Sequence, residues 1–225
     1  MTTYHVENSE GMRWIRANLS DDTVRAAKGA FNYMSGKIQM DSPWPRFRDL
    51  LVWAISSDSP WRPRFRGTGE LFLEPTLGGY HVLELDGTER WIFNNGIYWA
   101  SDGDVRLSIY RERMWTSFWL GEGMLWYHTS AFGRGKVIIR TGGPAQERVL
   151  NNEQLVIAGD YVLARTDGIK FKVRWAERSL FSHLLSGERA AHVYEGTGRL
   201  LLAPNPYWRI AIRSNKLYGD PFLDD

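Results

Sequence analysis

The chain has 225 residues, of which 43% are hydrophobic and 24% charged, and its formal net charge is only +2. This composition is typical of a globular protein with a substantial core, and the small net charge excludes a general attraction to nucleic acid or anionic membranes. The absence of cysteine excludes disulfides, a thiolate nucleophile and cysteine-ligated metal sites, and it favours a cytoplasmic location.

The first ten residues lack the pattern of a signal peptide, and no segment approaches the roughly 18 apolar residues that cross a bilayer. We therefore expect no transmembrane segment. Eleven tryptophans stand out. Tryptophan is a bulky core residue and a frequent interface anchor, so we expect most of them in the core and in subunit interfaces.

Three markers recur in the same order along the chain. The first is a glycine with an aromatic residue two positions later, the second a glycine before an alternating run, and the third a Gly-x-Gly before an apolar run. They fall at Gly29, Gly96 and Gly159; at Gly36, Gly103 and Gly168; and at Gly67 and Gly69, Gly133 and Gly135, Gly196 and Gly198. The leading glycines of the three Gly-x-Gly pieces are 66 and 63 residues apart. This spacing predicts three diverged copies of one structural unit.

The second marker reads Ser35-Gly36, Asp102-Gly103 and Asp167-Gly168. Asp-Gly between two alternating runs predicts a β-hairpin with a type I′ turn, which needs positive φ at both central positions. The Gly-x-Gly pieces lie between predicted strands without a following helix, so we interpret them as bulges or tight turns and not as dinucleotide-binding loops.

The segments that connect the second and third markers are the only helical candidates. Apolar residues follow a 3.6-residue period in the first and third connectors, and the middle one, Met114 to Leu120, is less regular. The periodic residues are Phe47, Leu50, Leu51, Ala54 and Ile55, then Leu180, Phe181, Leu184 and Leu185. We expect short helices or helical turns there and strands nearly everywhere else.

These elements predict an all-β protein with a pseudo-symmetric core. One unit of this size could not bury its apolar face alone, whereas three packed together can. We expect a single domain over residues 1–214, with repeats at about 21–85, 86–150 and 151–212, and a C-terminal tail over 215–225.

Several of these motifs resemble the altered-inheritance-of-mitochondria family, which is grouped with the tryptophan-RNA-binding-attenuator-like (TRAP-like) folds. The resemblance rests on Gly121-Glu122-Gly123-Met124-Leu125, on Gly196 to Pro204 and on the Asp-Gly pairs, and it spans roughly residues 22–206. It implies a β-sandwich-like, shortened double-stranded β-helix, often assembled as trimers or rings, without established catalytic residues. Its eukaryotic members are associated with mitochondrial organisation.

Two connectors depart from the family pattern. Residues 42–66 are poor in glycine, and Gly187-Glu188-Arg189-Ala190 stands where relatives have Gly-Glu-Gly-Leu. Any function of these connectors is therefore not carried over. We interpret the recurring Glu122 and Glu188 as structural residues that accept hydrogen bonds near a repeat junction.

The chain offers little that resembles a catalytic centre. Its five histidines show no metal-ligand spacing, although His183 and His192 flank Glu188. No nucleophile elbow or phosphate loop is present. We expect no catalytic residues, no metal and no cofactor.

A segment rich in arginine and tryptophan is the sharpest local feature. It can form a half-buried strand with arginines on one face, or an exposed basic and aromatic surface for single-stranded nucleic acid, an anionic membrane or an acidic partner. Its candidate binding residues are Trp44, Arg46, Arg48, Trp61, Arg62, Arg64 and Arg66.

We consider three functions for the protein, in order of preference. The first is a non-enzymatic homo-oligomer, a trimer or ring, that offers a surface to protein partners. The second is nucleic-acid binding through residues 44–66. The third is a cupin-like protein that holds a small ligand or metal inside the β core.

Overall fold

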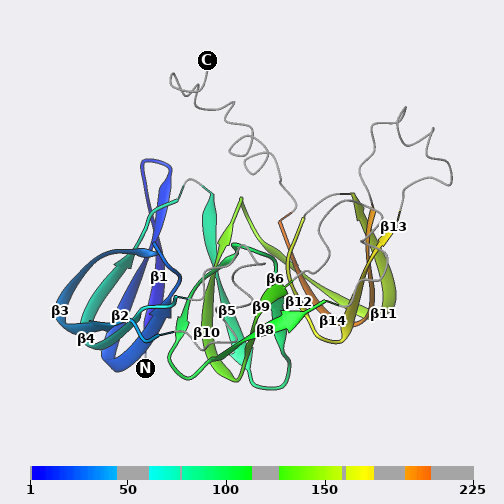
Figure 1. Cartoon of the computed structure of the whole chain (residues 1–225). Helices are drawn as coiled ribbons and strands as arrows, with labels where there is room; N and C mark the ends of the chain where they lie inside the picture. The colour runs from blue at the N-terminus through cyan, green and yellow to red at the C-terminus, as the bar shows by residue number, and fades with distance from the viewer. Residues whose placement is uncertain are drawn as a thin grey trace, which may run out of the picture.

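The computed structural model describes residues 2–44, 61–76, 78–112, 127–158, 161–174 and 191–203. They form 14 strands in two seven-stranded sheets, with antiparallel pairing throughout and no helix among them (Figure 1). The prediction of an all-β protein is confirmed. The predicted helical connectors lie outside the described residues.

Sheet A contains most of the N-terminal strands. Its members are β1 (Thr3–Ser9), β2 (Met12–Ala26), β3 (Phe31–Asp41), β4 (Arg64–Leu73), β5 (Gly79–Asp86), β7 (Tyr98–Asp102) and β10 (Arg134–Thr141). They lie in the order β3-β4-β2-β7-β10-β5, and β1 pairs with β2. The hairpin between β1 and β2 turns at Glu10 (φ 50°) and Gly11 (φ 81°), which matches a type I′ turn.

Sheet B contains most of the C-terminal strands. Its members are β6 (Trp91–Phe93), β8 (Arg106–Arg111), β9 (Tyr127–Phe132), β11 (Gln146–Ala158), β12 (Val162–Thr166), β13 (Ile169–Arg174) and β14 (Ala191–Leu202). They lie in the order β11-β14-β12-β6-β9-β8, and β13 pairs with β14. Among the described strands, the chain changes sheet five times, between β5 and β6, β6 and β7, β7 and β8, β9 and β10, and β10 and β11. The middle of the sequence therefore joins the two sheets.

The predicted hairpins at the three x-Gly pairs are wrong. Ser35 and Gly36 lie inside β3, which pairs with β4 over its whole length. The strands before and after Asp102-Gly103 belong to different sheets, and those around Asp167-Gly168 both pair with β14. Neither Gly103 nor Gly168 has a left-handed φ.

These glycines are needed because another backbone passes close by. A Cβ on Gly36 would lie 2.8 Å from the Gly69 Cα, and one on Gly168 would lie 2.3 Å from the carbonyl oxygen of Thr197. Gly36 and Gly168 therefore pack against the Gly-x-Gly piece of the neighbouring strand, and a side chain at either place would collide with backbone. Gly103 instead packs against Thr23 on β2, whose Cβ would lie 2.8 Å from the added Cβ.

Each Gly-x-Gly piece adopts a backbone that side-chain-bearing residues avoid. The φ values are 137° and 151° at Gly67 and Gly69, 113° and 137° at Gly133 and Gly135, and 131° and 155° at Gly196 and Gly198. Opposite the first and third pieces the partner strand has a register shift, at Asp21 in β2 and Asn152 in β11. The interpretation of these pieces as bulge sites is confirmed there.

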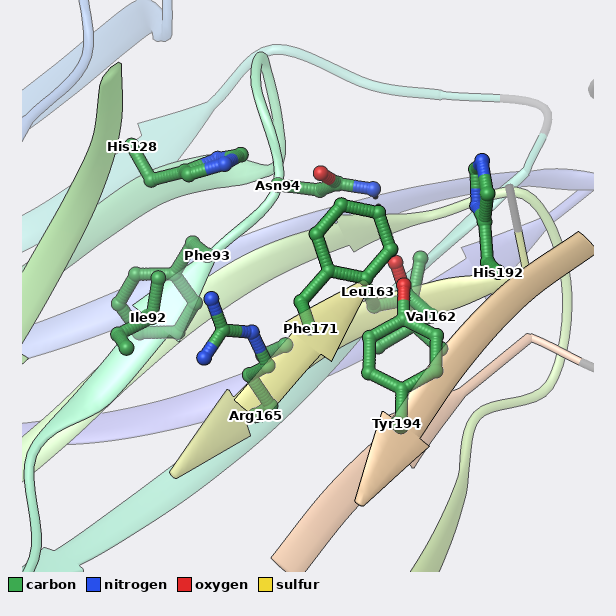
Figure 2. Close-up of a pocket in the computed structure, with 11 residues that line it drawn as sticks. Ile92, Phe93, Asn94, His128, Val162, Leu163, Arg165, Phe171, His192 and Tyr194 are labelled. Carbon is green, nitrogen blue, oxygen red and sulfur yellow. Dashed lines mark hydrogen bonds between the residues drawn. The ribbon is translucent and has the colours of Figure 1, made fainter. Parts of the chain in front are cut away.

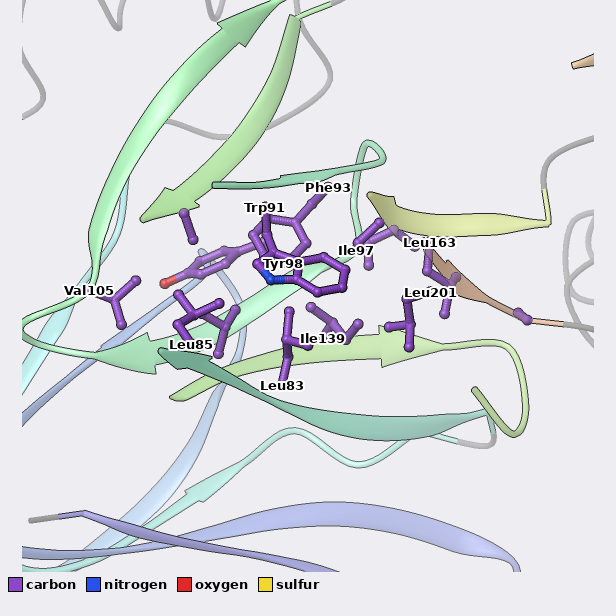
Figure 3. Packing of buried hydrophobic residues seen from close by; sticks show 14 residues of the cluster. Leu83, Leu85, Trp91, Phe93, Ile97, Tyr98, Val105, Ile139, Leu163 and Leu201 are labelled. Atoms are coloured by element: carbon purple, nitrogen blue, oxygen red, sulfur yellow. The ribbon is translucent and has the colours of Figure 1, made fainter. Parts of the chain in front are cut away.

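Three hydrophobic clusters follow one another through the molecule. The first lies within sheet A and includes Ile15, Phe65 and Leu71, and the third lies within sheet B and includes Leu150 and Leu200. The middle cluster fills the space between the sheets (Figure 3). It combines the following residues from sheet A and sheet B: Leu83, Leu85, Tyr98, Val137 and Ile139 with Trp91, Phe93, Ala131, Leu163 and Leu201.

Candidate functional site

A small cavity lies in sheet B, where β6, β9, β12, β13 and β14 supply its walls. Its polar lining residues are Asn94, His128, Arg165 and His192. Figure 2 shows Phe171 between Asn94 and Tyr194, with the two histidines on opposite sides of the pocket. The aromatic wall is tightly packed, since the rings of Phe171 and Tyr194 are 5.1 Å apart and those of Phe171 and His192 meet edge to face at 5.2 Å.

Sequence spacing did not reveal this pair of histidines. His128 lies on β9 and His192 on β14, and both are buried, at 6% and 5% exposure. The prediction considered His192 with His183, which lies outside the described residues. Only the arrangement of strands in sheet B places His128 and His192 at one cavity, because their strands are separated by β6 and β12.

A buried ion pair borders the cavity. The Arg165 guanidinium donates hydrogen bonds to the Glu112 carboxylate and to the carbonyl oxygen of Ile169, the latter at 2.6 Å. It also lies 5.7 Å from the ring centroid of Tyr110. Burial raises the pKa of Glu112, and the positive charge of Arg165 opposes that rise without cancelling it.

The cavity has little capacity for chemistry. Its volume of about 20 Å³ holds about one water molecule. The Asn94 amide nitrogen is engaged in a 3.0 Å hydrogen bond to the carbonyl oxygen of Val162. Within the described ranges, no group of three or more His, Cys, Asp or Glu residues could hold a metal ion.

The arginine and tryptophan segment is only partly described. Arg46 and Arg48 lie outside the described residues, whereas Trp44 is 86% exposed and Trp61 is half-buried. Arg64 and Arg66 are exposed on β4 on either side of Phe65, which is fully buried. Residues 64–66 therefore have the alternation expected of a half-buried strand.

Arg62 is held in place by contacts with both sheets. Its Nη2 donates a 3.0 Å hydrogen bond to Thr129 Oγ1 on β9, and its guanidinium lies 5.2 Å from the ring centroid of Tyr98 on β7. Arg62 thus connects sheet B to sheet A, and its exposure is intermediate.

The other predicted residues are the recurring glycines, the two glutamates and the tryptophans. Among the described glycine markers, Gly36, Gly67, Gly69, Gly168 and Gly196 lie close to a neighbouring backbone, whereas no atom lies within 4 Å of a Cβ built on Gly29 or Gly96. Glu122 and Glu188 lie outside the described residues. Of the five described tryptophans, Trp91 is fully buried, Trp14, Trp61 and Trp99 are half-buried and Trp44 is exposed.

Within the described part of the chain, no helix is long and apolar enough to cross a membrane. Comparison with curated proteins gave no match. Among solved structures, the chain is similar to the crystal structure of protein SPYM3_0169 from Streptococcus pyogenes. The TM-score is 0.71 at 17% sequence identity, over 97% of this chain and 100% of that one.

That likeness shows a shared fold. At the level of sequence, residues 4–205 match the model of the family described as mitochondrial biogenesis AIM24. The match extends from β1 to the end of β14 and covers most of the chain. This protein therefore belongs to the AIM24 family.

Proposed function

We propose that this protein is a non-catalytic assembly protein whose copies join through the two outermost strands, β3 and β11. The observation that carries the proposal is the exposure of these edges. Among the described strands, β3 pairs only with β4 and β11 only with β14. Figure 1 shows β3 and β11 at opposite ends of the molecule.

Both edges expose apolar side chains. Tyr33, Met34 and Met40 on β3 are 52%, 38% and 55% exposed, and Val149 and Val156 on β11 are 55% and 56% exposed. A long edge strand with unpaired backbone groups and apolar side chains is a template for pairing with another chain. Because the two edges differ, each copy would offer one edge to each neighbour, which gives a ring when the rotation closes.

One antiparallel register between β3 and β11 of two copies places their exposed apolar side chains opposite each other. If Lys37 faces Glu153 of a second copy, Met34 faces Val156. Since Asn152 is the bulged residue of β11, the register continues with Met40 opposite Val149. The apolar pairs then share one face of the joined sheet.

The same register also places residues of opposite charge across from each other. Asp41 falls opposite Arg148, so that both charged pairs, this one and Lys37 with Glu153, lie on the other face. A surface hollow of about 450 Å³ lies beside the β11 bulge and includes Glu153, Lys170 and Glu195 in its lining. It leaves room for the Lys37 side chain of a neighbour.

The test is the mass of the protein in solution, by light scattering on gel filtration at micromolar concentration. We expect an oligomer, and we expect Met34→Lys to dissociate it, because a lysine would face Val156. Val156→Glu in the same chain should restore assembly by supplying the opposite charge. Val6→Lys, at a 45% exposed position on β1, is the matched control and should leave the mass unchanged. A monomeric wild-type protein would refute the proposal.

We also infer that the chain consists of three copies of one unit. The support lies in residues that the sequence pattern did not include. Asp21, Gly87 and Asn152 all have left-handed φ and lie beside the middle of a Gly-x-Gly piece. The backbone N–H groups of Asp21 and Asn152 each donate a 3.0 Å hydrogen bond to the threonine there, Thr68 and Thr197. The TRAP-like arrangement stays a prediction from the resemblance.

Binding of single-stranded nucleic acid is the second candidate function. It is favoured by the exposure of Trp44, Arg64 and Arg66, which could supply stacking and phosphate contacts. Fluorescence anisotropy with a mixed oligonucleotide pool tests it, and the absence of binding at low salt would exclude it. The cytoplasmic location stays a prediction that rests on the cysteine-free composition.

A further inference from the structure

Two arginines face each other directly across two strands of sheet A. Arg25 on β2 is the cross-strand partner of Arg64 on β4. Like charges placed opposite each other on neighbouring strands destabilise a sheet. Within the described part of the chain, no ion pair involves Arg25, Arg62 or Arg64. None of these three guanidinium groups is therefore neutralised by an ion pair within the described residues.

A third arginine joins them from the residues that lead into β4. The N–H of Ala26 on β2 donates to the carbonyl oxygen of Pro63 at 3.0 Å. The pairing between β2 and this part of the chain therefore extends to Pro63, one residue before β4 begins. Arg62 is two positions before Arg64 and thus lies on the same side of this extended segment. Burial is the largest cause that lowers the pKa of Arg25, and the charges of Arg64 and Arg62 lower it further.

Two of the three guanidinium groups are held in place. Arg25 Nη2 donates to the carbonyl oxygen of Gly103, and Arg62 is fixed by Thr129 and the ring of Tyr98. Both arginines are half-buried, whereas Arg64 is exposed. The group therefore lies where sheet A meets sheet B, with two fixed cations and one cation open to solvent.

The nearby acids offset this charge only in part. Asp41 is the cross-strand neighbour of Arg64 on the β3 side, and Asp104 acts on Arg25 through space. Three guanidinium groups thus face two carboxylates. An arginine fork presents paired N–H donors that match the oxygens of a phosphate group, and arginine stays protonated at all ordinary pH values.

We propose that Arg25, Arg62 and Arg64 form a binding site for the phosphate group of a small molecule, either inorganic phosphate or a nucleotide monophosphate. A small ligand fits because the positive charge is confined to one place on a chain whose net charge is +2. Two preorganised arginines reduce the entropy lost when the ligand binds. The site goes beyond the assembly proposal and does not depend on it.

The test is calorimetric titration of the full chain with sodium phosphate and with AMP, at ionic strength held constant with sodium chloride. We expect saturable binding, and we expect Arg64→Gln to weaken it by about 10-fold or more, since it removes charged hydrogen bonds to the ligand. Arg25→Gln should weaken it similarly. Arg106→Gln, an exposed arginine on β8, is the matched control and should bind like the wild type.

The two ligands distinguish the source of the phosphate. Equal affinity for the two ligands indicates that inorganic phosphate suffices, and tighter binding of AMP indicates a nucleotide. Either result supports the site if Arg64→Gln weakens the binding. Binding that Arg64→Gln leaves unchanged would overturn the proposal. So would a response to oligonucleotides or anionic vesicles alone, with none to phosphate or AMP.

Discussion

At the scale of single residues, the buried pair of Glu112 and Arg165 is the most consequential feature of sheet B. Their side chains are 9% and 6% exposed. Removing both charges from water costs free energy that the pairing only partly returns, so the pair is a weak source of stability. Removing one partner of the pair is strongly destabilising, because the remaining charge would stay buried without compensation.

We predict that Arg165→Met destabilises the protein by about 3–5 kcal/mol at neutral pH. The raised pKa of Glu112 means that its contribution to stability is fully present below the unfolded value and is lost as pH rises through the folded pKa. Without Arg165 that pKa rises further, so the destabilisation should grow from pH 4 to pH 8. Urea unfolding at several pH values measures it.

The double variant Glu112→Leu with Arg165→Met serves as the control for this prediction. Removing both charges should restore most of the lost stability, because no buried charge is left alone. A destabilisation by Arg165→Met that does not change with pH would show that Glu112 is not the group responsible.

At the scale of elements, the recurring glycines contribute through two separate properties. One is the left-handed φ, and the other is the lack of a side chain where a neighbouring backbone passes. Gly67 needs both, since a Cβ there would lie 2.0 Å from the carbonyl oxygen of Lys37. Gly29 needs only the first, because its φ is 78° and no atom lies within 4 Å of the added Cβ.

We predict that Gly29→Ala costs about 1–2 kcal/mol, from backbone strain alone. Gly67→Ala should cost more than about 4 kcal/mol, because β3 and β4 must also separate to accommodate the methyl group. Chemical denaturation of the two variants measures the difference. Similar losses for both would mean that the pairing of β3 with β4 tolerates the side chain.

At the scale of the whole molecule, the described residues form three hydrophobic clusters arranged in series, and among these the middle one alone contains residues of both sheets. Ile139, fully buried on β10, belongs to that middle cluster, whereas Leu150 on β11, also fully buried, belongs to the third. The stability of the two sheets is therefore coupled through the middle cluster, and the third cluster supports sheet B alone.

We predict that Ile139→Ala and Leu150→Ala each cost about 2–5 kcal/mol, with different effects on amide hydrogen exchange. Ile139→Ala should speed exchange in β4 and in β14 alike, because it weakens the packing between the sheets. Leu150→Ala should speed exchange in β11 and β14 more than in β4. An equal effect of both variants on β4 would argue against this division.

Local sequence patterns were sufficient for those properties that depend on neighbouring residues. Alternating polar and apolar runs identified strands, and the regular spacing of glycines identified the places where the backbone is unusual. The same patterns misjudged Ser35-Gly36, Asp102-Gly103 and Asp167-Gly168. A glycine that admits a neighbouring backbone looks the same in sequence as one that makes a turn, since both show only the absence of a side chain.

By itself, the sequence determined that the protein is all-β, that it belongs to its family and where its special glycines lie. Only the tertiary structure decided that His128 and His192 line one cavity, that Glu112 pairs with Arg165 and that Arg25 faces Arg64. The physical reason is that strand pairing joins residues far apart in the chain. Which strands pair depends on packing across both sheets, and local sequence patterns carry no information about that packing.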